Sequence, residues 1–436
     1  MASSRNWPSS VVEGLPPGAA VCIGFSGGLD SVVLLDLLRQ QAAHPISALH
    51  VHHGLSPNAD AWAQFCARSC AERDVPLTVV RVKVDRNAPE GLEAAARAAR
   101  YAVYAQRPEP LIALAHHLDD QAETVLLQLL RGTGLKGVAA MPALRALPGS
   151  STQIYRPLLA YPRSMLEAHA KAAGLEWIED ESNASIVHDR NYLRREAAPL
   201  LDTRFPAWRE ALARFARRAA EAHELLDELA RLDGAAAAGL PVTALSNARR
   251  ANALRAFLAA NGVAMPSEAR LAEMARQLYG ARADARVRID HAGVSLVRHR
   301  DVVRIERGLD EIGAWRVEWR GEDELDLGPG RGTVRFERVT GKGLAAGRVP
   351  GRDWHFMPRA GGEKIRLDPR RPTRTLKNLL QERDVPAWQR EKLPLLFQGE
   401  QLVWVPGVGI AAEYACGEAE PGILPRWTVA GGAPLC

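Results

Sequence analysis

The feature that most constrains the fold is an alternation of short apolar runs with longer amphipathic stretches between residues 20 and 180. The apolar runs are typical of buried strands, and the stretches between them have the spacing of helices that pack one face on a core. The expected strands are 21–25, 46–51, 77–84 and 111–115. Strands that alternate with helices predict an α/β fold with a doubly wound parallel sheet, which binds ligands at the carboxyl ends of its strands.

Changes in composition and in hydrophobic periodicity divide the chain further. A long amphipathic stretch at 206–232 opens a region that reads as mostly helical, and alternating residues between 287 and 305 predict a small hairpin or meander. The Gly-, Pro- and acid-rich stretch 321–332 is typical of a linker. The expected parts are a catalytic α/β domain at 1–205, a mostly helical domain at 206–320, a linker at 321–342 and a small α+β domain at 343–436.

Composition excludes several classes of protein. With 47% hydrophobic and 25% charged residues among 436, the chain is not dominated by disorder, and no apolar run approaches the roughly 20 residues of a membrane span. We therefore expect no membrane partner. Five cysteines without CxxC spacing, and no secretory leader, indicate a reducing cytoplasm. The sequence carries no signal for an oligomeric state.

The basic residues are mostly arginine. The 56 basic and 51 acidic side chains give a net charge of +5, and 49 of the basic residues are arginine, whose planar group binds phosphate in a bidentate way. A GC-rich genome explains much of this abundance, so the positions of the arginines are more informative than their number. Basic runs at 190–218 and 352–377 suit RNA phosphates, or are solvated basic faces.

The strongest local signal is a six-residue loop between the first expected strand and its helix. It consists of Ser26, Gly27, Gly28, Leu29, Asp30 and Ser31. Its glycines let backbone N–H groups approach an anion, and the following helix start favours negative charge. It is not a Walker A loop. An acid at Asp30 inside a phosphate loop suggests a shared Mg²⁺ ion, and the alternative is a glycine-rich turn capped by Asp30.

A second motif, AHHLDDQAET at residues 115–124, follows the fourth expected strand and opens a helix. We expect Asp119 or Asp120 to cap this helix. His116 and Asp120, one turn apart, can hold a base or a metal. The alternatives are a purely structural cap with a hydrogen-bonded histidine, and a zinc or iron site. That metal site would use His50, His52, His53, His116 and His117.

The two motifs together carry a resemblance to a known family. SGGLDS resembles the PP-loop of ATP pyrophosphatases, which cleave ATP to AMP and pyrophosphate while adenylating a substrate. HHxDDxxET followed by LLRGTG closely resembles the tRNA(Ile)-lysidine synthetases, and related tRNA thiolases share part of it. GLEAAARAARY at 91–101, the segment 179–194 and three stretches of the C-terminal region fit the same family. The similarity spans about 23–200 and 359–413.

The resemblance implies an adenine nucleotide alpha hydrolase-like fold and a two-step reaction. ATP, with Mg²⁺, adenylates carbon 2 of the wobble cytidine in a tRNA(Ile) with a CAU anticodon. The ε-amine of L-lysine then displaces AMP and leaves lysidine. The chain would thus be a ligase that forms carbon–nitrogen bonds and acts on tRNA, not on DNA.

The resemblance also implies residue roles. The loop from Ser26 to Ser31 binds ATP, and Asp30 holds Mg²⁺ and is catalytic. His116 and Asp120 lie at the reacting cytidine. Contacts to ATP or tRNA come from Arg97, Arg190, Asn191 and Arg194.

The C-terminal region carries the remaining tRNA contacts expected from the sequence. The stretch 352–377 has six Arg and two Lys against three acids, or +5, and we expect Trp354, His355 and Phe356 to be available for stacking on bases. The basic residues assigned to tRNA are Arg352, Arg359, Lys364, Arg366, Arg370, Arg371, Arg374 and Lys377.

Three rival functions stay open at this point. A thiolase needs a cysteine near the nucleotide, but Cys66 and Cys70 have helical CxxxC spacing, which predicts a buried pair. A tRNA-binding relative without activity would not need an intact loop with its acid. A small-molecule ligase would leave both basic runs without a purpose.

Overall fold

The computed structural model describes residues 18–40, 44–179, 189–282, 285, 287–307, 314–349, 353–383, 385 and 387–428. Arg352 and residues 180–188 lie outside this set. The chain forms two compact units, Met1–Leu225 and Leu226–Cys436.

The first unit is built on a six-stranded sheet with the order β3-β2-β1-β4-β6-β5. Its strands are β1 Val21–Gly24, β2 Ile46–His52, β3 Leu77–Arg81, β4 Leu111–Ala113, β5 Leu144–Ala146 and β6 Gln153–Tyr155. All neighbouring pairs are parallel except β5 with β6, which is antiparallel. The chain order reverses direction beside β1, so the predicted doubly wound parallel sheet is confirmed. Strands β5 and β6 were not predicted.

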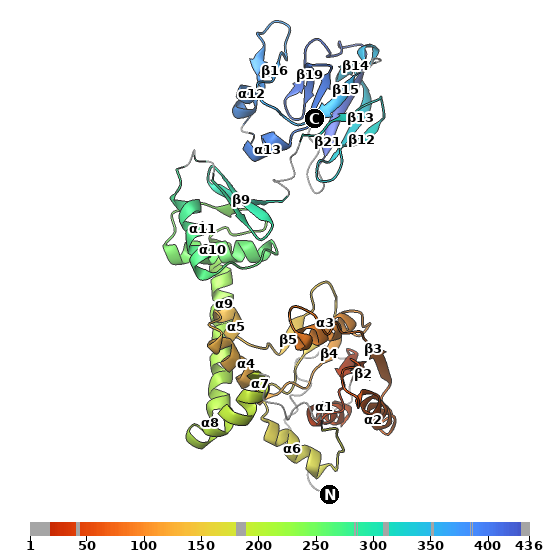
Figure 1. The fold of residues 1–436 in the computed structure, drawn as a ribbon, viewed down its shortest axis with the longest axis vertical. Coiled ribbons are helices and arrows are strands. Elements are labelled where there is room, and N and C mark those ends of the chain that lie inside the picture. Colours follow the sequence, from red (N-terminus) through yellow and green to blue (C-terminus); the bar gives the residue numbers. More distant parts are fainter. Residues whose placement is uncertain are drawn as a thin grey trace. The chain divides into compact units, whose positions relative to one another are not determined.

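Helices cover both faces of this sheet (Figure 1). They are α1 Leu29–Gln40, α2 Ala59–Ala71 and α6 Arg163–Ala172 on one face and α3 Leu92–Ala105 on the other. Two further helices, α4 Leu118–Leu130 and α5 Leu135–Val138, follow β4 in the sequence. Successive residues of a strand point to opposite faces. Val21 and Ile23 therefore pack in the core that holds α1, α2 and α6. Cys22 instead joins Tyr104 of α3 on the other face.

A run of short helices completes the unit and brings basic residues to α4. It comprises α7 Asp189–Tyr192, a π-helical turn Leu193–Ala197, α8 Ala198–Arg204 and the long helix α9 Trp208–Leu232. Ala198 and Trp208 pack against Ala122 of α4 in a small buried cluster. This packing holds α7 and the π-helical turn, a feature that is frequent at functional sites, beside α4.

The second unit begins with two helices and a four-stranded sheet. These are α10 Asn247–Ala260 and α11 Glu268–Gly280, with β7 Leu240–Pro241, β8 Val287–His291, β9 Val294–His299 and β10 Val302–Glu306 in the order β7-β10-β9-β8. Ser246 and Ser267 cap the two helices by accepting from backbone N–H groups. The predicted helices and the predicted meander are confirmed.

The C-terminal part contains two sheets that share one core. One has the order β11-β15-β18-β19-β20 and the other β12-β13-β21-β14. The strands are β11 Val317–Glu318, β12 Glu324–Asp326, β13 Thr333–Thr340, β14 Leu344–Ala345, β15 Trp354–Met357, β18 Leu395–Gln398, β19 Gln401–Val405, β20 Gly409–Ile410 and β21 Pro421–Thr428. A small pair, β16 Lys364–Ile365 and β17 Arg374–Thr375, precedes α12 Leu376–Glu382 and α13 Ala387–Lys392. The predicted α+β character is confirmed.

Two expectations for this region were wrong. Residues 321–342 are not a linker, because β12 and β13 lie there and β13 pairs with β21 along its whole length. Glycines and prolines fill the turns, while Val334 and Phe336 enter the core. Trp354, His355 and Phe356 are not available for stacking on bases, because all three are at least 97% buried. Trp354 and Phe356 lie in this core, and His355 stacks on Phe397.

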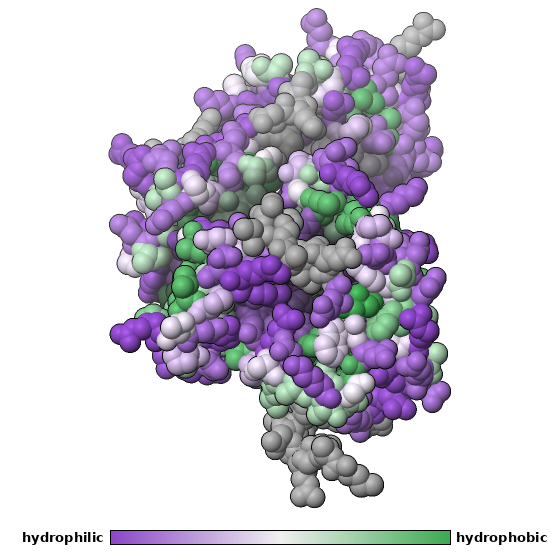
Figure 2. Space-filling model, turned by 60° about the horizontal axis from the view of Figure 1, so that its bottom comes forward, coloured by the Kyte–Doolittle hydropathy of each residue, from purple (hydrophilic) through white to green (hydrophobic). Residues whose placement is uncertain are grey.

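The described part of the chain has no helix that is both long and apolar enough to cross a lipid bilayer. Figure 2 shows a face that is mostly hydrophilic, with hydrophobic residues in small separate patches.

Candidate active site

The glycine-rich loop lies between β1 and α1, as its sequence predicts. Gly27 has φ of +84°, and a Cβ there would lie 2.6 Å from Cδ1 of Ile178. The Ile178 N–H also donates to the Gly27 carbonyl at 2.9 Å. The site therefore requires glycine at this position both for its backbone conformation and for space.

Two hydroxyls hold the loop. Ser31 Oγ accepts from the Gly27 N–H at 3.1 Å and donates to the Gly28 carbonyl at 2.9 Å. Ser26 Oγ accepts from the Gly28 N–H at 3.3 Å and lies 3.1 Å from Ser31 Oγ. Both glycine N–H groups thus donate to hydroxyl oxygens. An anion can take the place of these oxygens as the acceptor.

Asp30 occupies the first turn of α1. Its Oδ1 is buried and has no hydrogen-bond partner, and its Oδ2 lies 3.7 Å from Nε2 of His117. A buried carboxylate oxygen without a partner is costly unless a cation approaches it. The described residues hold no group of three or more His, Cys, Asp or Glu that could bind a metal. The carboxylate of Asp30 fits Mg²⁺, because this ion commonly uses one or two carboxylates together with substrate phosphates. The described histidines, cysteines and acids do not support the zinc or iron alternative.

The helix α4 begins with a reciprocal cap that differs from the expected one. His117, and not Asp119 or Asp120, is the N-cap residue. Its N–H donates to Oδ2 of Asp120 at 3.1 Å, and the Asp120 N–H lies 3.4 Å from Nδ1 of His117. Asp120 completes this capping box, so one acid does contribute to the cap.

His117 is 1% exposed and faces three carboxylates. Asp119 lies 3.6 Å away and Asp120 3.4 Å away, in addition to Asp30. Burial alone would lower the pKa of His117, but hydrogen bonds with Asp119 and Asp30 and the charge of Asp120 raise it to about 10. Because this pKa lies well above 7, His117 is protonated at neutral pH and gives the site a fixed positive charge beside the loop. The protonated ring donates from Nδ1 towards Asp119 and cannot accept from the Asp120 N–H, so in this state the cap consists of the bond from the His117 N–H to Oδ2 of Asp120.

His116 has the opposite character. Burial lowers the pKa of His116 to about 3, although the charge of Asp120 acts in the other direction. Its Nδ1 is buried and has no partner. His116 is therefore neutral at pH 7 and keeps one ring nitrogen available for a substrate.

Two carboxylates and two guanidinium groups form a network behind these histidines. Arg190 Nε donates to Glu123 at 2.8 Å and its Nη2 to Asp120 at 3.0 Å. Arg194 makes the same pair of contacts at 2.8 and 3.2 Å. Burial raises the pKa of Asp120, but the charges of His117 and Arg190 outweigh it and the net pKa is lowered. Asp120 is thus held ionised and in one orientation.

Two residues of this unit that were predicted to contact ATP or tRNA remain to be placed, Asn191 and Arg97. Asn191 follows Arg190 in α7 and is half-buried. Arg97 lies on α3, is exposed, and donates to the Tyr101 hydroxyl at 3.1 Å. The sequence interpretation gave no role in the proposed reaction to His117 or Glu123, although both are fixed positions of the HHxDDxxET motif. Glu123 also lies one helical turn after Asp120.

The predicted basic residues of the C-terminal region fall into two groups. Four are paired with acids: Arg359 with Glu363, Arg366 with Glu413, Arg371 with Asp368 and Arg374 with Glu382. Lys364, Arg370 and Lys377 are exposed and have no acidic partner within the described parts of the chain. Arg352 is not among the described residues.

The cysteine pair behaves as predicted. Cys66 and Cys70 are both at most 1% exposed. Burial raises the pKa of Cys66 to about 12 and that of Cys70 to about 11. At neutral pH both are thiols in a core, which is unlike the thiolate that a sulfur-transfer enzyme needs.

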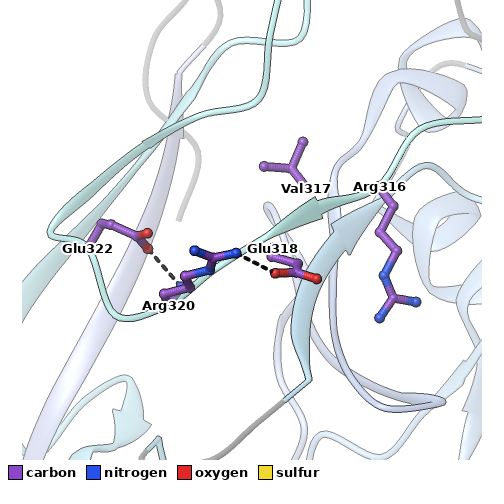
Figure 3. Close-up of a pocket in the computed structure, with 5 residues that line it drawn as sticks. All are labelled: Arg316, Val317, Glu318, Arg320 and Glu322. Atoms are coloured by element: carbon purple, nitrogen blue, oxygen red, sulfur yellow. Dashed lines mark hydrogen bonds and ion pairs between the residues drawn. The ribbon is translucent and has the colours of Figure 1, made fainter.

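One pocket lies in the C-terminal part, on and beside β11 (Figure 3). Arg320 donates to Glu318 at 3.0 Å and its backbone N–H to Glu322 at 2.7 Å, and Arg316 pairs with Asp353 at 2.6 Å. The charged side chains that line the pocket are therefore already paired with neighbouring charged groups. None of the predicted site residues lines the pocket.

Comparisons with known proteins match parts of both units to one family. Three family models match: a PP-loop domain at residues 9–201, a TilS substrate binding domain at 241–304 and a TilS substrate C-terminal domain at 355–427. The tRNA(Ile)-lysidine synthase of Azoarcus sp. is 45% identical over 430 residues, which are 96% of this chain and 93% of that protein. That of Aromatoleum aromaticum is 42% identical over 426 residues, or 96% and 99% of the two chains.

Solved structures show more distant similarity. A U34-tRNA thiolase from Methanococcus maripaludis matches with a TM-score of 0.41 and 18% identity, over 47% of this chain and 73% of that one. This level of similarity has no bearing on activity. Full-length identity above 40% to two relatives of one name does, and the chain belongs to the tRNA(Ile)-lysidine synthase family.

Proposed function

We propose that this chain uses ATP to join L-lysine to carbon 2 of the wobble cytidine in tRNA(Ile) with a CAU anticodon, releasing AMP and pyrophosphate. The product, lysidine, pairs with adenine, so the tRNA would read AUA. The names of the full-length relatives support this reaction. The observation that carries it is the juxtaposition of an anion-binding loop with Asp30, His117, Asp120 and Arg190.

In the first step the carbonyl oxygen of the cytidine attacks the α-phosphorus of ATP. A bond forms between these two atoms, and the bond from the α-phosphorus to the leaving pyrophosphate breaks. The N–H groups of Gly27 and Gly28 and the start of α1 are suited to hold the phosphates. His117, which is positively charged, lies next to the same loop because its Nε2 is 3.7 Å from Oδ2 of Asp30. When bound, Mg²⁺ would be held by Asp30 and would neutralise charge on the departing pyrophosphate.

In the second step the ε-amine of lysine attacks carbon 2, and AMP leaves with the former carbonyl oxygen. Lysine must first lose a proton, because an ammonium group has no free electron pair. His116 is neutral at pH 7 and can accept that proton. Its pKa of about 3 describes the site without substrates, and the negative phosphates would raise it towards the range of an effective base.

The network of Asp120, Glu123, Arg190 and Arg194 would orient the reacting groups. Each arginine bridges both carboxylates, so the position of Asp120 is fixed from two sides. Asn191 on α7 and Arg97 on α3 would contact ATP or the tRNA. In the C-terminal region, the exposed Lys364, Arg370 and Lys377 are the best suited to contact tRNA phosphates.

The decisive experiment measures AMP release by the purified chain with ATP, Mg²⁺ and each amino acid in turn, with and without tRNA. The proposal expects release only when lysine and tRNA are both present. Release that depends on a sulfur donor and not on lysine would instead favour a thiolase. Binding of tRNA without any AMP release would identify an inactive relative.

A further inference from the structure

Four arginines of the first unit have no acidic partner among the described residues. They are Arg97 and Arg100 on α3, Arg145 on β5, and Arg156 directly after β6. Other arginines of this unit behave differently: Arg190, Arg194 and Arg209 each contact a carboxylate at 3.2 Å or less. An uncompensated group of cations is a signature of a site for an anion.

Three members of this group gather around Tyr101. The Arg97 guanidinium lies 4.8 Å from the centre of the Tyr101 ring, and that of Arg145 lies 5.4 Å from it. Arg97 also donates to the Tyr101 hydroxyl. Both arginines are exposed, so the ring orients two cations that remain open to a ligand. Burial lowers the pKa of Arg156, its interaction with the Tyr101 side chain acts in the other direction, and the nearby charges of Arg145 and Arg97 lower it further.

Arg156 provides an independent sign of a missing partner. The residue is 2% exposed, and its Nη1 donates to the Pro142 carbonyl at 2.8 Å. Its Nε is buried and has no partner, as is Nε of Arg100. Buried guanidinium groups normally have their donors satisfied. Nε of Arg209 is likewise buried but lies 2.6 Å from Asp119, whereas neither Arg100 nor Arg156 has a carboxylate within ion-pair distance among the described residues.

The order of the strands arranges these groups along one line. The glycine-rich loop follows β1, His116 follows β4, Arg156 follows β6, and Arg145 lies on β5, and these strands are successive neighbours in the sheet. Strands lie roughly 4.8 Å apart, so β5 is about 14 Å from β1. A triphosphate held by the loop does not extend that far. Arg156 and Arg145 thus lie on the opposite side of His116 from the loop, and Arg97 is brought to the same side because it and Arg145 both contact the Tyr101 ring.

We propose that Arg97, Arg145 and Arg156, oriented by Tyr101, bind a phosphodiester of the tRNA next to the target nucleotide. This inference rests on the proposed function, because it takes tRNA as the substrate. The loop binds one anionic substrate, His116 marks the reacting base between the two sites, and the arginines bind the backbone of the second substrate. Guanidinium groups suit this role because they can contact a phosphate with two hydrogen bonds.

The test compares two variants in the full chain. Arg145→Gln removes an exposed cation, and Arg156→Lys keeps the charge but loses the planar fork. We expect each to weaken tRNA binding by about 5- to 10-fold, and Arg145→Gln to reduce the slope of log affinity against log salt by about one. The affinity for a non-hydrolysable ATP analogue should not change. The matched control is Arg39→Gln, an exposed arginine at the end of α1 that should leave both affinities unchanged.

The outcomes separate the possible sources of phosphate. Weaker binding of the ATP analogue with an unchanged tRNA salt slope would assign the cluster to ATP and overturn the proposal. Unchanged tRNA binding in both variants would overturn it as well. A thermal unfolding midpoint near that of the parent shows that Arg156→Lys is folded, and Arg145→Gln tests the site without touching the core. Failure of the proposed function would appear separately, as a parent protein without lysine-dependent AMP release.

Discussion

Two arginine-rich regions of this chain differ in what surrounds their charges. In the first unit, Arg190 and Arg194 contact the buried Glu123, whereas Arg97, Arg145 and Arg156 have no acidic partner among the described residues. In the segment 359–377 of the C-terminal region, arginines such as Arg366 and Arg374 pair with acids that are 39% and 57% exposed. We propose that the same residue type serves two purposes. Buried charges would fix a reaction geometry, and solvated charges would attract a polyanion at long range.

The first prediction contrasts a buried ion pair with an exposed one. Glu123→Gln should destabilise the first unit by about 3–5 kcal/mol, because it leaves two guanidinium groups without their buried carboxylate. Glu413→Gln, which removes the partner of Arg366, should cost about 0–1 kcal/mol. Urea unfolding of both variants gives the comparison. Equal costs would show that burial does not distinguish the two regions.

The second prediction concerns the acid of the loop. Asp30→Asn should reduce product formation by about 10²–10³-fold, because the developing charge on pyrophosphate loses its stabilising cation. Binding of tRNA should stay nearly unchanged, since most of its affinity comes from cations elsewhere. The control is Asp74→Asn, which retains a residue that tolerates the left-handed backbone there (φ of 52°). Full activity of Asp30→Asn at saturating ATP and Mg²⁺ would remove Asp30 from the mechanism.

The third prediction uses the opposite pKa shifts of the two adjacent histidines. The ordinary pKa of 6.5 applies to the unfolded chain, and His116 drops to about 3 when folded, so its contribution to stability is lost as pH falls from 6.5 towards 3. His117 rises to about 10, so its contribution is complete below pH 6.5 and is lost as pH rises towards 10. His116→Gln should therefore flatten the acid side of the stability profile, and His117→Gln the alkaline side.

The measurement is the free energy of unfolding of the parent and both variants between pH 4 and about 10. If both substitutions changed the same side of the profile, the assignment of a neutral His116 and a charged His117 would be wrong.

The fourth prediction addresses the solvated region. Replacing Lys364, Arg370 and Lys377 by Gln should weaken tRNA binding by about 10-fold and lower the salt slope by about two to three, since each phosphate contact contributes about 0.7–0.9. The rate of AMP release at saturating tRNA should change little. Arg335→Gln, which removes an exposed arginine paired with Glu324, serves as the control. An unchanged slope in the triple variant would exclude these side chains from the tRNA interface.

The sequence was informative where a local pattern has one structural solution. Four strands of the first sheet followed from apolar runs between amphipathic helices. Strands β5 and β6 did not, because each has three residues and Leu144–Ala146 is exposed throughout. The supposed linker misled for a related reason: its glycines and acids lie in turns and on the outer face of β13, whose buried positions are only Val334 and Phe336.

The site was predictable only in part for a physical reason. Asp30, His116 and Asp120 stand in recognisable motifs, but two adjacent histidines do not reveal which ring will face three carboxylates and become charged. Glu123 acquires its meaning from Arg190 and Arg194, which lie 67 and 71 residues away in sequence. Such long-range pairs leave no local pattern, and neither does the absence of an acid beside Arg156.

The central claim is that the carbonyl oxygen of the wobble cytidine leaves on AMP. It is tested by supplying tRNA that carries oxygen-18 at this one position, with ATP, Mg²⁺ and lysine, and measuring the label in AMP, pyrophosphate and RNA by mass spectrometry. The account predicts that one labelled oxygen appears in AMP for each lysine incorporated, and none in pyrophosphate. Label that remains in the lysine-bearing RNA, or AMP that carries none, would contradict it.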